Sequence, residues 1–347
     1  MRCGLTLVLL LAACKHSQPF PLTDYGGHQP FAPGSPRRLT FNLGNDYAPG
    51  WLADGSSILY SVVRLDTPHF DRCLGLLPAT GGTLSRVMCD RAVGYGDSVT
   101  VFEESAAAAD GRLAYVASRS SVGALAPTRM ALVLGTLAIP APADPLQTTP
   151  FPVPDGAGIA QVRWLDAGTL VYLAERVDHP AKCRFCPPDT VRTGLDVVRV
   201  ALGGATPLAQ VVPGTLNATS VTPGESADVV YYTVSGESRV HRRVLSSGAD
   251  SVVHDFGTGM ARDVSFAAGR LAVVVGGNVS VTYDSTLGHA VQRDSGGPLH
   301  VVDLASGRDT ILASVLPFRR PALSPSGKQL VAEAVAGNLD LWLFDLP

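Results

Sequence analysis

The chain has 347 residues, a net charge of −3, and hydrophobic residues at 46% of its positions. This length allows one to three domains, and the apolar fraction is large enough for an extensive core. The slightly acidic charge gives no support to nucleic-acid binding, which needs a basic surface.

The first residues have the pattern of an export signal. Arg2 supplies a positive charge, and Leu5–Ala13 is a short apolar run. Such a run cannot span a bilayer as a helix, which takes about 20 residues. The run ends in Leu11–Cys14, which resembles the bacterial lipobox, where the signal is cut before a cysteine that carries lipid. An ordinary secretory signal with a chance cysteine is the alternative.

The lipobox resemblance implies a signal peptide at residues 1–13 and lipidation of Cys14. Residues 14–36 would then be a lipidated flexible tether, because the segment is rich in Pro, Gly, Gln and His. Acyl chains on Cys14 would bind the membrane firmly, since each buried CH₂ contributes about 0.8 kcal/mol. Lys15 follows the cysteine, and by resemblance to enteric lipoproteins this favours the outer membrane. We therefore expect a lipid-anchored protein that faces the periplasm.

A repeat of about 57 residues runs through the remaining chain. In the first copy the motif Trp51–Gly55 precedes the apolar segment Ser57–Tyr60, and in the third copy Trp164–Gly168 precedes Thr169–Tyr172. The six motifs are anchored at positions 51, 107, 164, 221, 266 and 323, so their spacings are 56, 57, 57, 45 and 57. Six near-equal repeats indicate a repeat architecture.

Each repeat predicts four β-strands. A first strand ends at the anchor, Asp-Gly or Pro-Gly makes a tight turn, and a β-branched and aromatic strand follows. Small polar turns then separate two further strands. Four strands per repeat, arranged radially, form a propeller blade. We therefore expect an all-β fold, a six-bladed β-propeller that occupies residues 37–347 as one domain.

The last repeat lacks a fourth strand. Its sequence supplies strands at Ala322–Leu323, Gln329–Val335 and Leu339–Leu346. Arg37–Phe41, at the other end of the propeller sequence, is the candidate for the missing strand. We therefore predict that this N-terminal strand closes the last blade, because an unpaired edge there would invite aggregation.

Two repeats resemble a known family. Arg38–Thr40 with Pro49–Tyr60, and Pro321–Gly327 with Asn338–Trp342, are similar to the TolB-type (WD40-like) β-propeller repeat. That pattern is a Leu-Thr strand end, then Pro-x-Trp-Ser-Pro-Asp-Gly and an apolar strand. The middle four repeats match it only weakly. The resemblance implies a six-bladed propeller and names no partner.

Four cysteines remain outside the signal and the lipid site, and this even number suits two disulfides in an oxidising compartment: Cys73, Cys89, Cys183 and Cys186. Cys73 and Cys89 bracket a predicted hairpin and can face each other. Cys183 and Cys186 form a CxxC motif in a loop, which can be a redox motif, half a zinc site or a local disulfide. We favour the local disulfide.

If the strands of a blade are A to D from the inside outward, the longest B–C loops lie in blades 1, 3 and 5. They span Arg64–Arg72, Glu175–Gly194 and Gly276–Gly297. Long loops on one face of a rigid scaffold are the usual place for function. Each holds one histidine near an acid, His69, His179 and His289. These could mark a binding face or hold a divalent metal, and three separately solvated histidines are the alternative.

Arg293–Leu299 contains Asp-Ser-Gly-Gly-Pro, which looks like the sequence around the nucleophile of chymotrypsin-like proteases. A serine nucleophile needs a positioned histidine base, and no histidine occurs in the protease context. We interpret the segment as a turn. The predicted innermost strands are mostly apolar and small, which favours binding over catalysis. We expect a monomeric scaffold that binds an envelope protein or a small ligand. The alternative is a propeller hydrolase or lyase with a metal at the channel mouth.

Overall fold

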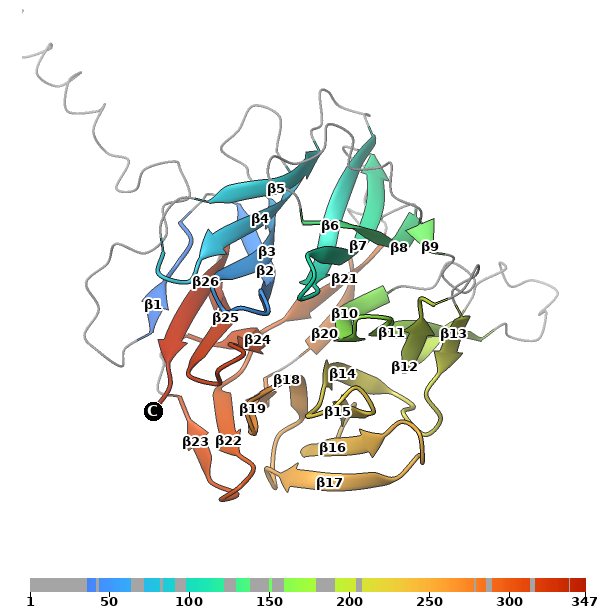
Figure 1. The fold of residues 1–347 in the computed structure, drawn as a ribbon, viewed down its shortest axis with the longest axis vertical. Helices are drawn as coiled ribbons and strands as arrows, with labels where there is room; N and C mark the ends of the chain where they lie inside the picture. Colours follow the sequence, from blue (N-terminus) through green and yellow to red (C-terminus); the bar gives the residue numbers. More distant parts are fainter. Residues whose placement is uncertain are drawn as a thin grey trace, which may run out of the picture.

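The computed structural model describes residues 36–41, 44–63, 72–81, 84–90, 98–121, 129–137, 150–151, 159–178, 191–203, 208–277, 279–284, 289–312, 316–336 and 338–347. Within these residues, all elements of regular secondary structure are β-strands. No helix long and apolar enough to cross a membrane occurs among them. Six four-stranded antiparallel sheets stand around a common centre (Figure 1). The predicted six-bladed β-propeller is confirmed.

The chain builds the first three blades in order, each from the inside outward. Blade 1 contains β2 (Asn45–Trp51), β3 (Ser57–Val63), β4 (Arg72–Pro78) and β5 (Ser85–Asp90). Blade 2 contains β6 (Ser98–Ala107), β7 (Arg112–Ser121), β8 (Arg129–Thr136) and β9 (Pro150–Phe151). Blade 3 contains β10 (Ile159–Asp166), β11 (Thr169–Asp178), β12 (Val191–Ala201) and β13 (Leu208–Val211).

The last three blades follow the same plan with two departures. Blade 4 contains β14 (Ala218–Pro223), β15 (Val229–Val234), β16 (Arg239–Val244) and β17 (Asp250–Asp255). Blade 5 contains β18 (Ala261–Ala267), β19 (Arg270–Val275), β22 (Leu299–Asp303) and β23 (Asp309–Ile311), and is interrupted by a hairpin of β20 (Val279–Asp284) and β21 (His289–Asp294). Blade 6 contains β24 (Phe318–Leu323), β25 (Gln329–Ala336) and β26 (Asn338–Asp345), with β1 (Arg37–Arg38) on its outer edge.

The N-terminal strand closes blade 6, as the sequence predicts. Arg37 lies opposite Leu343, and the pairing continues where the Leu39 amide donates to the carbonyl oxygen of Leu341 at 2.7 Å. Thr40 Oγ1 accepts a hydrogen bond from the Leu341 amide at 3.0 Å. Leu39 and Thr40 are both fully buried, so this segment is part of the core as well as of the sheet.

The core is divided into six clusters, one between each pair of neighbouring blades. The B strands explain this division, because successive side chains of a strand point to opposite faces. In β15, Val229 and Tyr231 pack toward blade 5, whereas Val230 and Tyr232 pack toward blade 3. A strand that is apolar on both faces therefore joins two blade interfaces, which is why these strands lack the alternation of a half-exposed sheet.

A disulfide joins Cys73 and Cys89, as predicted for this pair. The two residues face each other across β4 and β5, with a Cα–Cα distance of 4.1 Å. In the chain-entropy model, closing a loop of this size stabilises the fold by about 3 kcal/mol. Cys183 and Cys186 lie outside the described residues, and their disulfide stays a prediction.

Candidate binding site

All six innermost strands carry a register shift within the five residues before the anchor, and in β2, β10, β18 and β24 it falls at the same position of the repeat. The register shifts fall between Tyr47 and Gly50, Phe102 and Glu104, Ala160 and Arg163, Ala218 and Ser220, Arg262 and Ser265, and Arg319 and Ala322. At four bulges a non-glycine residue adopts a left-handed backbone: Ala48 at φ 52°, Gln161 at 53°, Asp263 at 53° and Arg320 at 47°. This conformation costs about 1–2 kcal/mol per residue, so the surrounding contacts must hold it in place.

Polar side chains near the bulges bond to the backbone of the next blade, and these bonds join blades 3, 4, 5, 6 and 1 in succession. Four amides each donate to a side chain of the preceding blade: Val221 to Gln161 Oε1 at 2.8 Å, Val264 to Ser220 Oγ at 2.9 Å, Arg320 to Asp263 Oδ2 at 3.2 Å and Ala48 to Glu333 Oε1 at 2.5 Å. The side chains of the bulge region therefore first serve to close the propeller.

Four charged side chains form an ion-pair network that we call the central plug: Glu104, Arg163 and Arg320 on innermost strands, and Glu333 on β25. Arg320 reaches from blade 6 to Glu104 of blade 2 at 3.5 Å, and its other terminal nitrogen lies 3.6 Å from Glu333. Arg163 of blade 3 lies 3.9 Å from the second oxygen of Glu104. Both carboxylates are buried, and a buried carboxylate is stable only beside such compensation.

The two arginines of the plug differ in how their surroundings change the pKa of the guanidinium. Burial lowers the pKa of Arg320, but Glu333, Glu104 and Asp263 together outweigh burial and hold this pKa above its ordinary value. Burial also lowers the pKa of Arg163, and there the carboxylates of Glu104 and Asp263 do not restore it, because the positive charge of Arg320 opposes them. Arg320 is therefore well compensated by protein carboxylates, whereas Arg163 is not.

Tyr47 closes the plug on the side of blade 1. Its hydroxyl donates to the carbonyl oxygen of Phe102 at 2.9 Å. Burial, and then the negative charge of Glu103, raises the pKa of the Tyr47 phenol well above its ordinary value. Tyr47 is therefore a neutral hydrogen-bond donor at physiological pH.

A cavity of about 560 Å³, which we call the funnel, opens at the end of the propeller formed by the A–B turns. Its wall is aromatic and rich in proline, with Trp51, Trp164, Phe266, Pro49, Pro223 and Pro321. Arg163 belongs to both the funnel and the central plug. The funnel therefore combines apolar walls with one incompletely compensated cation, and a few polar groups in an apolar cavity are typical of a ligand site.

The repeat positions the two funnel tryptophans in the same way. Each occupies an anchor position and donates from Nε1 to a backbone carbonyl oxygen of the preceding blade, Trp51 to Ala322 at 2.8 Å and Trp164 to Ala106 at 3.0 Å. Phe266, at the anchor of blade 5, packs on Tyr231 with ring centroids 4.7 Å apart. The aromatic wall is therefore rigid, because the repeat itself locks it.

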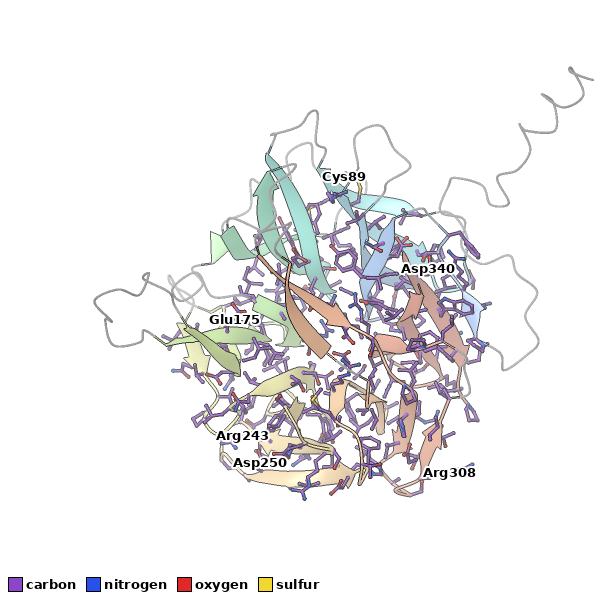
Figure 2. All side chains as sticks on the ribbon, turned by 180° about the vertical axis from the view of Figure 1, so that it is seen from behind. Cys89, Glu175, Arg243, Asp250, Arg308 and Asp340 are labelled. Carbon is purple, nitrogen blue, oxygen red and sulfur yellow. A yellow bond between two sulfur atoms is a disulfide. The ribbon has the colours of Figure 1, made fainter. Side chains whose placement is uncertain are left out.

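The β20–β21 hairpin is the B–C loop of blade 5 and projects toward the centre of the ring (Figures 1 and 2). Arg262 holds its base through an ion pair with Asp294 at 2.7 Å and a hydrogen bond to the carbonyl oxygen of Gly276 at 3.1 Å. Asp294 also accepts from the Gly296 amide at 2.8 Å, and Gly296 has a φ of +65°. The protease-like segment is therefore a turn that re-enters the blade, as the sequence interpretation holds.

Of the three predicted binding-face histidines, His289 alone belongs to the described residues. His289 begins β21, where it pairs with Asp284, and nothing is described of its side chain. His69 and His179 lie outside the described residues, as does Cys14. Within the part of the chain that is described, no three His, Cys, Asp or Glu side chains form a group that could hold a metal. The histidine face and the metal both stay predictions.

The prediction that the innermost strands are mostly apolar and small is wrong at the bulges. The position three residues before each anchor holds a charged or amide side chain in four of the six repeats: Glu104, Gln161, Asp263 and Arg320. Alignment of the six repeats on their anchors contains this signal. A polar residue recurring inside an otherwise apolar strand indicates a position with a special role.

These features define a class of protein, a β-propeller with a plugged centre and a funnel at one end. No family model and no curated protein matches the sequence. Among solved structures, TolB from Acinetobacter baumannii is similar at a TM-score of 0.52 and 13% identity, covering 82% of this chain and 58% of that chain. The fold of this protein is that of a TolB-like six-bladed β-propeller.

Two enzymes share this fold. A gluconolactonase from Xanthomonas campestris is similar at a TM-score of 0.58 and 12% identity, covering 95% of this chain and 99% of that chain. Puromycin hydrolase is similar at 0.54 and 14% identity, covering 87% of this chain and 52% of that chain. The chain therefore spans little more than half of TolB and of puromycin hydrolase, and at these identities the likeness shows the fold alone.

The pKa of Asp263 leads to a pH-dependent prediction. Burial raises this pKa above its ordinary value, and Arg320 opposes the increase only in part. An unfolded aspartate titrates near about 3.9, so between that pH and the raised value the folded state binds more protons. The free energy of unfolding should therefore fall as the pH rises through this window.

In the variant Asp263→Asn the side chain is neutral at every pH, so its unfolding free energy should not fall in this way as the pH rises. The Oδ1 atom of the asparagine can still accept a hydrogen bond from the Arg320 amide. Urea unfolding of both proteins at several pH values from about 4 to about 7 measures the difference in unfolding free energy. A difference that is constant, or that grows in favour of the wild type as the pH rises, would contradict the assignment.

Proposed function

We propose that this protein is a binding scaffold of the cell envelope, which receives a segment of a partner protein or a small ligand in the funnel. The funnel carries the proposal, because it joins a rigid aromatic and proline-rich wall to the guanidinium of Arg163, whose nearest carboxylate oxygen, on Glu104, lies 3.9 Å away. Rigid aromatic side chains contribute large contact areas and lose little entropy on binding, so they are frequent hot spots of interfaces.

The arrangement of the carboxylates favours binding over catalysis. Glu333 accepts from the Ala48 amide and is paired with Arg319 at 2.5 Å, and Asp263 accepts from the Arg320 amide. These contacts assign both carboxylates to holding the innermost strands together. A general acid or base needs a carboxylate that reaches the substrate, whereas these two are committed to the ring.

The funnel and the histidine face that the sequence predicts would lie at opposite ends of the propeller. A–B turns surround the funnel, and the B–C loops with His69 and His179 belong to the other end. We place the partner at the funnel because Trp51 and Trp164 are fixed in its wall by hydrogen bonds and Arg163 opens onto it. The alternative site is the end formed by the B–C loops. If the protein is a hydrolase or lyase, its metal would bind there.

We also propose that Cys14 is acylated and tethers the propeller to the periplasmic side of the outer membrane. Residues 14–36 would hold the propeller close to the membrane surface, where it can meet envelope partners. The expected result is that the wild-type protein incorporates radiolabelled palmitate and sediments with membranes, whereas Cys14→Ser does neither. A Cys14→Ser protein that still carries the label would remove the lipobox assignment.

Site-specific photo-crosslinking in living cells tests the binding face. A photoreactive residue at Ala268 or Pro325, both exposed at the funnel, should give a discrete crosslinked product. The same residue at Val252 on the outer strand β17, which is 47% exposed, is the control and should give none. Products obtained only from Pro180, in the B–C loop of blade 3, would contradict the funnel and favour the histidine face. Metal that co-purifies in stoichiometric amount and is lost from a His69→Ala variant would favour the enzyme.

A further inference from the structure

The guanidinium of Arg163 has donors that the protein does not use. Among the described residues it makes one hydrogen bond, from Nη1 to the carbonyl oxygen of Val162 at 2.8 Å. Its ion pair with Glu104, also through Nη1, is long at 3.9 Å. The side chain keeps 30% of its surface accessible, and Nε and Nη2 are not among the buried atoms without partners. These two nitrogens therefore form an open donor fork next to the funnel.

A second polar group at the funnel also lacks a partner. Ser105 is only 2% exposed, lines the funnel, and its hydroxyl makes no hydrogen bond with any described residue. An unsatisfied buried hydroxyl costs about 1–3 kcal/mol, so it indicates a position where a ligand group can bind. Arg163 and Ser105 come from neighbouring blades, 3 and 2, and thus line one side of the same cavity.

The remaining charge at the funnel is already neutralised. Glu225 accepts hydrogen bonds from Arg242 Nε at 2.9 Å and from the Tyr231 hydroxyl at 3.0 Å. Burial works to raise the pKa of Glu225, but these bonds outweigh burial and hold the pKa below its ordinary value. Glu225 is therefore an ionised carboxylate with its own cation, and it cannot compensate Arg163.

We propose that the group seated deepest in the funnel is a carboxylate of the ligand, bound by the free donor fork of Arg163 with Ser105 beside it. A guanidinium fork matches the two oxygens of a carboxylate, and such paired bonds are short and strong. A single cation that already has the carboxylate of Glu104 at 3.9 Å suits a monoanion better than a doubly charged phosphate. The aromatic wall then takes the apolar part of the ligand. This inference rests on the proposed function, since it names the chemistry of the same site.

Binding of 3-phenylpropionate and of its neutral amide tests the inference, because the two probes differ only in the carboxylate. Trp51 and Trp164 line the funnel, so tryptophan fluorescence reports binding, and a Trp342→Phe background removes the third of the three tryptophans. The wild-type protein should bind the acid about tenfold more tightly than the amide. Arg163→Met should bind the two probes equally, and Arg163→Lys should keep only part of the preference.

Glu225→Gln is the matched control, because it removes a charge from the same cavity without touching the fork. It should leave the preference for the acid unchanged or increase it. Equal binding of both probes to the wild type would contradict the recognition of a carboxylate by Arg163, while still supporting the funnel as a binding site. A failure of both probes to bind would overturn the funnel itself. Since the wild-type comparison decides between these outcomes, the test does not depend on the Arg163 variants being folded.

Discussion

Replacement of Arg320 by methionine is expected to lower the free energy of unfolding by about 3–5 kcal/mol, the range for removing one partner of a buried ion pair. The substitution leaves Glu104 without its 3.5 Å partner and takes one of two arginines from Glu333, and both carboxylates are buried. The uncompensated carboxylates, rather than the lost contact itself, account for most of the effect.

Urea denaturation at neutral pH measures this loss. The control is Arg239→Met, which removes an exposed ion pair to Asp255 at 3.1 Å and should cost no more than about 1 kcal/mol. Figure 2 labels a second ion pair of blade 4, between Arg243 and Asp250 at 3.2 Å. A loss of less than about 1 kcal/mol for the Arg320 variant would show that the plug does not depend on this charge.

Deletion of residues 1–40 is expected to lower the free energy of unfolding by about 5 kcal/mol. The deletion removes the fully buried Leu39, which contributes roughly 1.5–3 kcal/mol. It also removes hydrogen bonds to Leu341 from the backbone of Leu39 and the side chain of Thr40, worth about 1 kcal/mol each. The ion pair of Arg38 with Asp340 at 2.9 Å is lost as well, and the edge of β26 is left open.

The matched control is deletion of residues 1–35, which leaves β1 intact. This shorter deletion should melt within a few degrees of the full chain. Thermal unfolding and size-exclusion chromatography of the two proteins compare them directly, and the longer deletion should also associate through its exposed edge. If both deletions are equally stable, the N-terminal strand does not close the ring.

The repeat explains why the fold is predictable from the sequence. A tight turn followed by an apolar strand recurs at nearly constant spacing, as after Trp51 and Trp164. This recurring pair is enough to predict one blade in each repeat. The missing strand of the last repeat is predictable for the same reason, because a sheet edge in the core must be paired. The disulfide between Cys73 and Cys89 follows from their positions on either side of one hairpin.

The central plug is harder to predict, because its contacts join different repeats. Arg320 and Glu104 are more than 200 residues apart in the sequence, and the closed ring brings them together. Their orientation also depends on a left-handed backbone at Arg320, which sequence propensity disfavours for an arginine. The funnel is hard to predict for the same reason, because each of several blades contributes one short segment to its wall. Loop length alone instead predicts a binding site at the end of the propeller formed by the B–C loops, because the longest insertions in the sequence occur there.

A crystal structure of the wild-type protein soaked with 3-phenylpropionate tests the central claim most directly. The predicted result is the phenyl ring between Trp51, Trp164 and Phe266, with the carboxylate oxygens about 2.7–2.9 Å from Nε or Nη2 of Arg163. Density for the probe at the B–C end, beside His69 or His179, with an empty funnel would contradict the account.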